Sequence, residues 1–153
     1  MPTEIALFAR IATGFALAFI IGFERGLRGS PAGDRTFSLI GLSATAVAAT
    51  VAKSSPQAVA GVITGIGFIG AGVVWQYHEA FIRGITTAAA IFATAGIGIV
   101  VGTGHLWLGA VNTALVVFVL ELRNIPALHR LDARRYRDRF RDDDDPPRPY
   151  RPR

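Results

Sequence analysis

The chain has 153 residues, of which 51% are hydrophobic and 18% charged, and its formal net charge is +5. Residues 123–153 hold 10 of the 16 Lys and Arg residues and 6 of the 11 acids. Residues 1–122 therefore keep only 6 bases and 5 acids, whereas roughly a quarter of an average globular chain is charged. This composition argues against a soluble globular enzyme, and it argues against a disordered protein, which would be poor in apolar residues.

The basic charge and the absence of cysteine narrow the chemistry further. With no cysteine in the sequence, disulfides, cysteine-bound zinc and a thiol nucleophile are excluded. The C-terminal residues 123–153 supply +4 of the net charge. A basic segment beside apolar helices meets anionic lipid headgroups more often than nucleic acid. We therefore expect the lipid bilayer as a partner and no nucleic acid.

The first predicted element is an apolar helix over residues 5–23. At about 1.5 Å per residue it reaches roughly 29 Å, close to the thickness of a bilayer core. Its start is acidic at Glu4, and Arg10 interrupts the apolar run. A signal peptide would have a basic start and an unbroken apolar core, so the segment is predicted to remain as a spanning helix. The stem of Arg10 is expected to snorkel toward the outer surface.

Long runs without Asp, Glu, Lys or Arg predict the other spans. Such runs cover residues 36–52, 54–78 and 84–120. The last run is too long for one helix, and the sequence Gly-Thr-Gly-His at 102–105 predicts a break within it. The predicted fold is an all-α, polytopic membrane domain over residues 1–122 with five transmembrane helices, at 5–23, 37–52, 58–75, 84–102 and 106–122.

The arginines predict the orientation of this domain. Loop 24–36 carries three arginines, loop 76–83 carries one, and ten more follow the last span. With five spans these segments share one side, and the opposite side receives only Lys53. The positive-inside rule then places the N-terminus outside and the C-terminus in the cytoplasm. Four spans would divide the basic loops between both sides.

The polar C-terminal residues 123–153 are predicted to form two segments. Residues 123–141 form the first, and from Pro126 onward they lack glycine and alternate arginines with apolar residues. This pattern predicts a basic cytoplasmic helix, lying on the membrane surface or simply solvated. Residues 142–153, with the sequence DDDDPPRPYRPR, predict a disordered tail.

Glycines at short spacing predict close helix packing in the third and fourth spans. Gly65, Gly67 and Gly70 spell G-x-G-x-x-G, but they lie inside an apolar span and lack the preceding strand that dinucleotide binding requires. Small residues let membrane helices approach closely. The contacts can lie within one chain or between copies, and we expect a homo-oligomer, in the first place a dimer. The predicted packing residues are Gly61, Gly65, Gly67, Gly70, Gly72, Gly98 and Gly102.

A polar pocket is predicted at the cytoplasmic ends of the first four spans. A carboxylate at the membrane boundary is costly unless paired, so Glu24 is a candidate functional residue. The alternative is a basic loop that only sets topology, with Glu24 neutralising an arginine. The pocket would hold a lipid headgroup, a phosphate or a partner's carboxylate. Its predicted residues are Glu24, Arg25, Arg28, Arg35, Thr36, Arg83, Thr86 and Thr87, with Trp75 at the same depth.

No arrangement typical of catalysis or metal binding is present in the sequence. His78, His105 and His129 are scattered, and no HExxH, GxSxG or P-loop motif occurs. Zinc sites and nucleophilic sites require such spacings. We therefore expect no enzymatic activity, no cofactor and no bound catalytic metal.

Three sequence blocks resemble one family. GFERGLRGSPAGDRT, TGIGFIGAGVVW and IRGITTAAAIFATAGIGIVVGTG occur in the order and spacing of the MgtC/SapB membrane proteins, over residues 8–122. The resemblance implies a multi-pass protein of the bacterial inner membrane. It also implies roles in growth at low magnesium, stress adaptation and virulence, and a partner such as the F-type ATP synthase, which some members restrain.

The family pattern also maps onto particular residues. Its acidic-basic pair falls on Glu24 and Arg25, its loop arginines on Arg28 and Arg35, and its threonine pair on 86–87. The sequence departs from the family at Asp34, where an apolar residue is usual, and at Phe92, where tryptophan is common. The longer members have a C-terminal ACT-type domain, so this sequence resembles a short member without it.

The sequence is compatible with two main functions and with a third, less favoured one. The first is a non-enzymatic regulator that binds a membrane partner, acting in low-magnesium adaptation and membrane energetics. The second is a small transporter or channel for a cation such as Mg²⁺, although the spans carry acids only near their ends, at Glu24 and Glu121, and cation pathways usually need rings of carboxylates or carbonyls. The third is a structural protein that binds lipid between its arginines.

Overall fold

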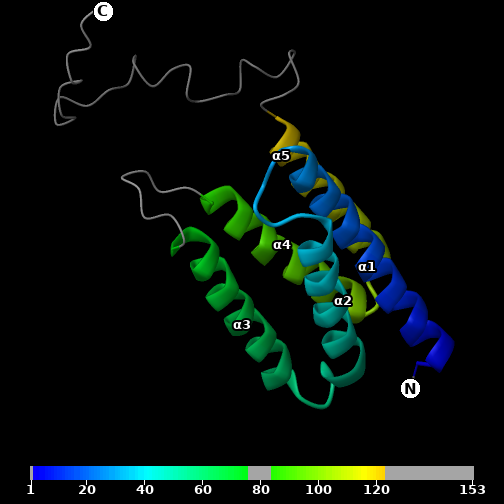
Figure 1. Cartoon of the computed structure of the whole chain (residues 1–153). Helices are drawn as coiled ribbons and strands as arrows, with labels where there is room; N and C mark the ends of the chain where they lie inside the picture. Colours follow the sequence, from blue (N-terminus) through cyan, green and yellow to red (C-terminus); the bar gives the residue numbers. More distant parts are fainter. Residues whose placement is uncertain (1, 76–83, 123–153) are drawn as a thin grey trace, which may run out of the picture. The chain divides into compact units, whose positions relative to one another are not determined.

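The computed structural model describes residues 2–75 and 84–122, and all regular structure in these two ranges is helical. The chain divides into two units, residues 1–117 and 118–153, and the packing described below concerns the first unit. Figure 1 shows consecutive helices running in alternating directions. The helices are α1 (Glu4–Leu27), α2 (Asp34–Val51), α3 (Pro56–Trp75), α4 (Ile85–Gly102) and α5 (Leu106–Glu121). Arg83 and the predicted segments 123–141 and 142–153 lie outside the described residues.

The first helix extends beyond its predicted end. The hydroxyl of Thr3 caps α1 by accepting a hydrogen bond from the Ala6 amide at 3.3 Å, the usual role of threonine at this position. We predicted an end at Phe23, but α1 continues to Leu27 and stops before Gly29, whose φ of +68° suits glycine. The predicted loop therefore loses one helical turn, because its first four residues satisfy their backbone groups inside α1.

The predicted break in the longest apolar run is confirmed. α4 ends at Gly102 and α5 begins at Leu106. Between them Gly104 adopts a φ of +103°, a conformation that a residue with a Cβ rarely takes. The chain reverses direction there.

The length and composition of three helices suit membrane crossing. They are Glu4–Leu27, Pro56–Val74 and Ile85–Gly102, and Leu106–Glu121 is a shorter apolar helix. Helix α2 is absent from both groups, since its 18 residues include Asp34, Arg35 and five Ser or Thr residues. The structure thus bears out a helical protein with several apolar helices, while five crossings and their orientation remain predictions.

Helices α1, α2 and α4 form the packed core, in which each helix contacts the other two. Phe37, Ala44 and Thr45 of α2 are at most 1% exposed, as are Ile21 of α1 and Ile91 of α4. The hydroxyls of Ser38 and Thr45 are buried in this core without a hydrogen-bond partner among the described residues, whereas the other three hydroxyl residues of α2 are exposed. We refer to these three helices as the α1–α2–α4 core.

Glycines allow the close approach within this core. A Cβ added at Gly102 would lie 2.6 Å from the carbonyl oxygen of Thr45, and one added at Gly98 would lie 2.9 Å from the Cβ of Ala44. Gly14 and Gly41, which the sequence analysis did not single out, make equally close contacts between α1 and α2. The packing predicted for the α4 glycines is therefore observed within one chain.

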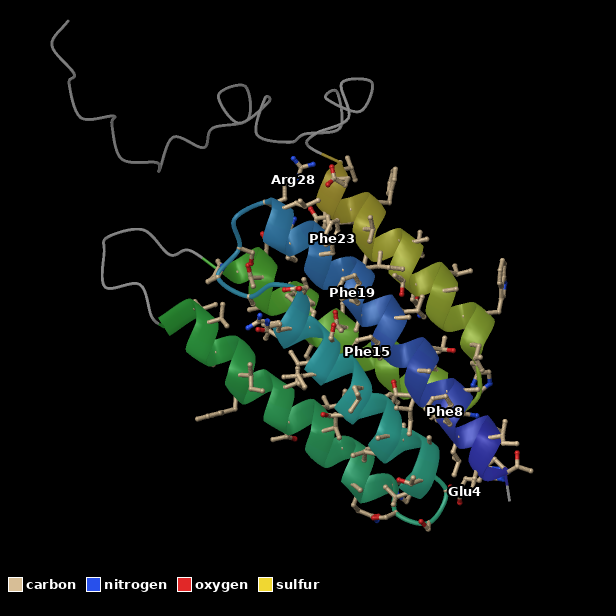
Figure 2. All side chains as sticks on the ribbon, turned by 45° about the vertical axis from the view of Figure 1, so that its right-hand side comes forward. Glu4, Phe8, Phe15, Phe19, Phe23 and Arg28 are labelled. Carbon is tan, nitrogen blue, oxygen red and sulfur yellow. The ribbon has the colours of Figure 1, made fainter. Side chains whose placement is uncertain are left out.

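The outer side of α1 carries a ladder of aromatic rings. Figure 2 shows Phe8, Phe15, Phe19 and Phe23 along one side of the helix, each between 41% and 73% exposed. Ring centroids lie 6.4 Å apart for Phe15 and Phe19, and 6.0 Å apart for Phe19 and Phe23. Stacking at four-residue spacing stabilises the helix, and an exposed apolar side of this kind suits a hydrocarbon environment.

Candidate functional site

The last turn of α1 holds a buried ion pair between two consecutive residues. The Nε of Arg25 donates to Oε2 of Glu24 at 2.5 Å, and Nη2 of Arg25 donates to Oε1 at 2.6 Å. The two side chains are only 11% and 8% exposed. A two-pronged contact between a guanidinium and a carboxylate is the strongest common form of charged hydrogen bond. The predicted pairing of Glu24 is therefore present in the fold.

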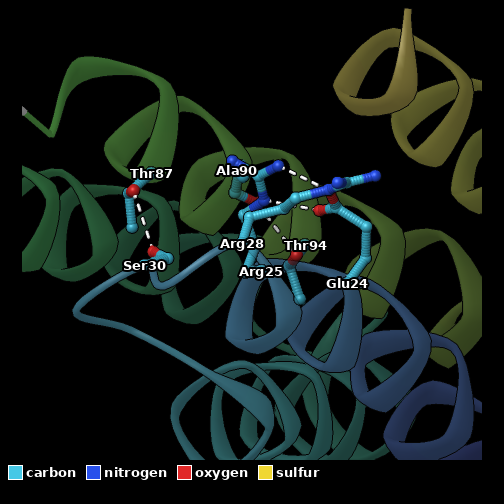
Figure 3. Close-up of polar contacts among 7 residues, drawn as sticks. All are labelled: Glu24, Arg25, Arg28, Ser30, Thr87, Ala90 and Thr94. Carbon is cyan, nitrogen blue, oxygen red and sulfur yellow. Dashed lines mark hydrogen bonds and ion pairs between the residues drawn. The ribbon is translucent and has the colours of Figure 1, made fainter. Parts of the chain in front are cut away.

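A second arginine approaches the same carboxylate. Nε of Arg28 lies 3.6 Å from Oε1 of Glu24, and the Arg28 side chain is 44% exposed. Glu24 thus faces two cations. Figure 3 places Ala90 and Thr94 of α4 beside the two guanidinium groups. Arg28 is the more exposed of the two arginines.

A hydroxyl pair links the loop after α1 to the start of α4. Oγ of Ser30 and Oγ1 of Thr87 are 3.0 Å apart, with Thr87 buried and Ser30 half-buried. Figure 3 shows this pair at the same end of the helices as the ion pair. The N-cap of α4 is Gly84, which offers no side-chain acceptor. The Ser30–Thr87 contact joins the loop after α1 to the first turn of α4.

The structure brings together only part of the predicted pocket. Glu24, Arg25 and Arg28 form one cluster, and Thr87 joins that end of the fold through Ser30, which was not predicted. Arg35, Thr36 and Thr86 lie in the first turns of α2 and α4 with exposed side chains. Ser30 gave only a weak signal in the sequence, because serine is common in loops of every kind.

An arginine also reaches across the opposite end of the core. Nη1 of Arg10 in α1 donates to the carbonyl oxygen of Gly102 at 3.0 Å. Gly102 ends α4, where carbonyl groups lack helical partners and carry partial negative charge. We expected the stem of Arg10 to snorkel, and the structure gives its guanidinium a specific acceptor within the chain.

The described residues give little support to a metal centre. Among residues 2–75 and 84–122 there is no group of three or more His, Asp or Glu side chains that could hold a metal ion. Glu24 is the buried acid of this part of the chain, and both of its oxygens face arginines.

The apolar helices, their shared core and the polar end define a helical membrane protein. The chain belongs to the MgtC family, whose sequence profile matches residues 11–130. This agrees with the resemblance of the three sequence blocks.

Individual relatives match most of the chain. An uncharacterized protein of Haemophilus influenzae is 32% identical over 150 residues, covering 88% of the chain and 63% of the relative. Protein MgtC of Brucella abortus is 37% identical over 120 residues, covering 74% and 50%. A protein of Escherichia coli K12 named "Putative magnesium transporter YhiD" is 38% identical over 130 residues, covering 76% and 57%. The chain thus spans about half to two thirds of these relatives. No solved structure matches it.

Proposed function

We propose that the protein is a non-enzymatic regulator in the bacterial inner membrane. It acts in adaptation to low magnesium and in membrane energetics by binding a membrane-protein partner such as the F-type ATP synthase. Membership of the MgtC family over residues 11–130 supports this proposal, together with the magnesium-related name of the E. coli relative. In this proposal five helices cross the membrane, with the Glu24–Arg25 pair on the cytoplasmic side.

The pairing of the buried Glu24 carboxylate with arginine is the observation that favours a regulator over a transporter. Glu24 is 6% exposed, and its two oxygens accept from Arg25 at 2.5 and 2.6 Å. Mg²⁺ binds through oxygen ligands, usually one or two carboxylates, and gives up its waters reluctantly. A carboxylate already neutralised by arginine offers little to such an ion.

The partner contact is assigned to Arg28. Its side chain is 44% exposed and lies at the edge of the buried pair. In this proposal a carboxylate of the partner contacts the exposed part of the Arg28 side chain, because guanidinium groups bind carboxylates well.

Co-purification of the partner tests this role. The Arg28→Ala variant is expected to recover at least fivefold less ATP synthase from mild detergent extracts than the native chain. Lys53→Ala, which removes an exposed cation at the opposite end of α2, is the matched control and should change recovery little. If the native chain recovers no ATP synthase and its deletion leaves ATP hydrolysis in membrane vesicles unchanged, this partner is wrong.

Cation transport is the second candidate, and the name of the E. coli relative favours it. Purified protein in liposomes under a Mg²⁺ gradient separates the two functions, with a Mg²⁺-sensitive dye inside the vesicles. Regulation predicts flux no greater than in empty liposomes. Robust flux that Glu24→Gln abolishes would establish transport instead.

Self-association through α3 is proposed as well. No atom of the described residues lies within 4 Å of a Cβ added at Gly61, Gly65 or Gly72, so within this part of the chain their side of α3 is open. Close contact between small residues is a common basis of helix pairing in membranes. Because the sequence has no cysteine, a single Gly61→Cys variant should form a disulfide-linked dimer in membranes, whereas Lys53→Cys should not.

A further inference from the structure

Two hydroxyl groups of α2 are buried without satisfying their hydrogen-bonding capacity. Oγ of Ser38 and Oγ1 of Thr45 have no partner within residues 2–75 and 84–122, and the two residues are 5% and 0% exposed. Because they are seven residues apart, they lie two turns apart on the same side of the helix. A hydroxyl group that leaves water without gaining a new partner raises the free energy of the arrangement that buries it. The packed core therefore carries a cost at this side of α2.

Thr45 differs from the other threonines that have a helical turn before them. Inside a helix, a threonine hydroxyl can donate to the carbonyl oxygen four residues earlier. Five threonines of the described residues make this bond: Thr13, Thr50, Thr64, Thr94 and Thr113. Oγ1 of Thr45 instead faces the backbones of Gly14 in α1 and Gly98 in α4. The hydroxyl is thus directed into the junction of the three core helices.

The middle of α2 presents only small side chains to the core. The buried positions between residues 41 and 48 are Gly41, Ala44, Thr45 and Ala48. Two of them lie against glycines of α4, Ala44 against Gly98 and Ala48 against Gly102. This part of α2 has no long side chain to withdraw from its neighbours when the helix shifts, which suits the small sliding motions that packed helices make.

Polar contacts fasten α1 to α4 but do not include α2. Nη1 of Arg10 in α1 donates to the carbonyl oxygen of Gly102 in α4 at 3.0 Å, and Ser30 in the loop after α1 contacts Thr87 of α4 at 3.0 Å. Within the two described ranges, the hydrogen bonds and ion pairs include none between α2 and either α1 or α4. A shift of α2 therefore loses dispersion contacts only, whereas a separation of α1 from α4 would break the Arg10 hydrogen bond.

We propose that α2 is the movable helix of the α1–α2–α4 core. In a second, less populated arrangement α2 shifts away from the α1–α4 pair, and water reaches the hydroxyls of Ser38 and Thr45. The hydroxyls gain hydrogen bonds to water. The apolar contacts that are lost can be replaced by lipid chains, since no hydrophobic force holds helices together in a membrane. The Glu24–Arg25 pair lies within α1 and persists in both arrangements.

Labelling of single cysteines with N-ethylmaleimide in membrane vesicles tests this proposal. The chain has no cysteine of its own, and maleimides react with the thiolate, which burial in apolar surroundings disfavours. Ser38→Cys should therefore be labelled about tenfold faster than the control Thr113→Cys. Thr113 of α5 is similarly buried, at 3% exposed, but its hydroxyl donates to the carbonyl oxygen of Gly109.

Removal of the Thr45 hydroxyl tests the physical cause of the shift. Thr45→Ala takes away the group that the packed arrangement leaves unsatisfied, so labelling of Ser38→Cys should become about fivefold slower. Thr94→Ala is the matched control, because Thr94 is also 0% exposed but its hydroxyl donates to the carbonyl oxygen of Ala90. This second change should not slow the labelling.

Two results would overturn the proposal. Labelling of Ser38→Cys that is no faster than that of Thr113→Cys would show that α2 stays packed. A rate that Thr45→Ala leaves unchanged would show that the buried hydroxyl does not favour the shift. Thr45→Cys is a second reporter, expected to be labelled as fast as Ser38→Cys, in case that variant fails to fold. None of these readouts depends on ATP synthase recovery or Mg²⁺ flux, so the proposed function is tested separately.

Discussion

Helices α3 and α4 both carry glycines at four-residue spacing, yet the two sets lie in different surroundings. Gly98 and Gly102 of α4 press against α2, where an added Cβ would come within 3 Å of α2 atoms. For Gly61 and Gly65 of α3, none of the residues in 2–75 and 84–122 has an atom within 4 Å of an added Cβ. Over an 18-residue stretch of each helix, half of the α4 residues are buried inside the fold, whereas only 6% of the α3 residues are buried. The same motif serves internal packing in one helix and leaves an open surface in the other.

This difference indicates that the α1–α2–α4 core and helix α3 have different roles in the domain. The α1–α2–α4 core is held by close backbone approach and by an arginine of α1 at each end, Arg25 beside α4 near its start and Arg10 on the carbonyl of Gly102. Helix α3 contacts only part of that core and presents its remaining surface outward. We expect stability to reside in the core, and contacts with lipid or a second copy to reside in α3.

The largest effect is expected from Glu24→Ala, at the end of the core. The change leaves the buried guanidinium of Arg25 without its carboxylate, and breaking a buried ion pair in this way costs about 3–5 kcal/mol. Unfolding in detergent, followed by circular dichroism during titration with sodium dodecyl sulfate, measures the loss. Glu4→Ala removes an exposed acid from the same helix and should cost far less. Equal losses for the two variants would show that the pair does not stabilise the core.

The next effect is expected from Gly102→Ala. The added methyl group would meet the Thr45 carbonyl oxygen at 2.6 Å and the Ala48 Cβ at 2.7 Å. Because a backbone oxygen cannot rotate away, α2 and α4 must separate, at a cost of about 1–3 kcal/mol. The same titration measures it. An unchanged midpoint would mean that these helices do not approach each other as closely as the structure shows.

The smallest effect, with the opposite sign, is expected from Gly61→Ala. The added methyl group meets open space, and alanine is favoured over glycine inside a helix by about 0.8–1.0 kcal/mol. The unfolding midpoint of the monomer should stay the same or rise slightly. A loss as large as that of Gly102→Ala would place α3 inside the core and remove the contrast between the two helices.

Several features of the site followed from residue types and order alone. The composition predicted apolar helices, and Gly102 to His105 predicted the break before α5, since glycine allows the conformation that the turn needs. Glu24 was expected to be paired because an isolated carboxylate is costly in such surroundings. The observed pair with Arg25 fits that expectation.

Other features depended on which surfaces met. Ser30 and Thr87 are 57 residues apart and form a contact, and Gly14 and Gly41 join α1 to α2. Of these four positions only Thr87 carried a distinctive pattern in the sequence. Length, hydropathy and glycine spacing are properties of single segments, so the sequence by itself determined the helices and their apolar character. The tertiary structure alone decided that α4 is enclosed while α3 keeps an open side, because burial depends on the neighbour that each helix face receives.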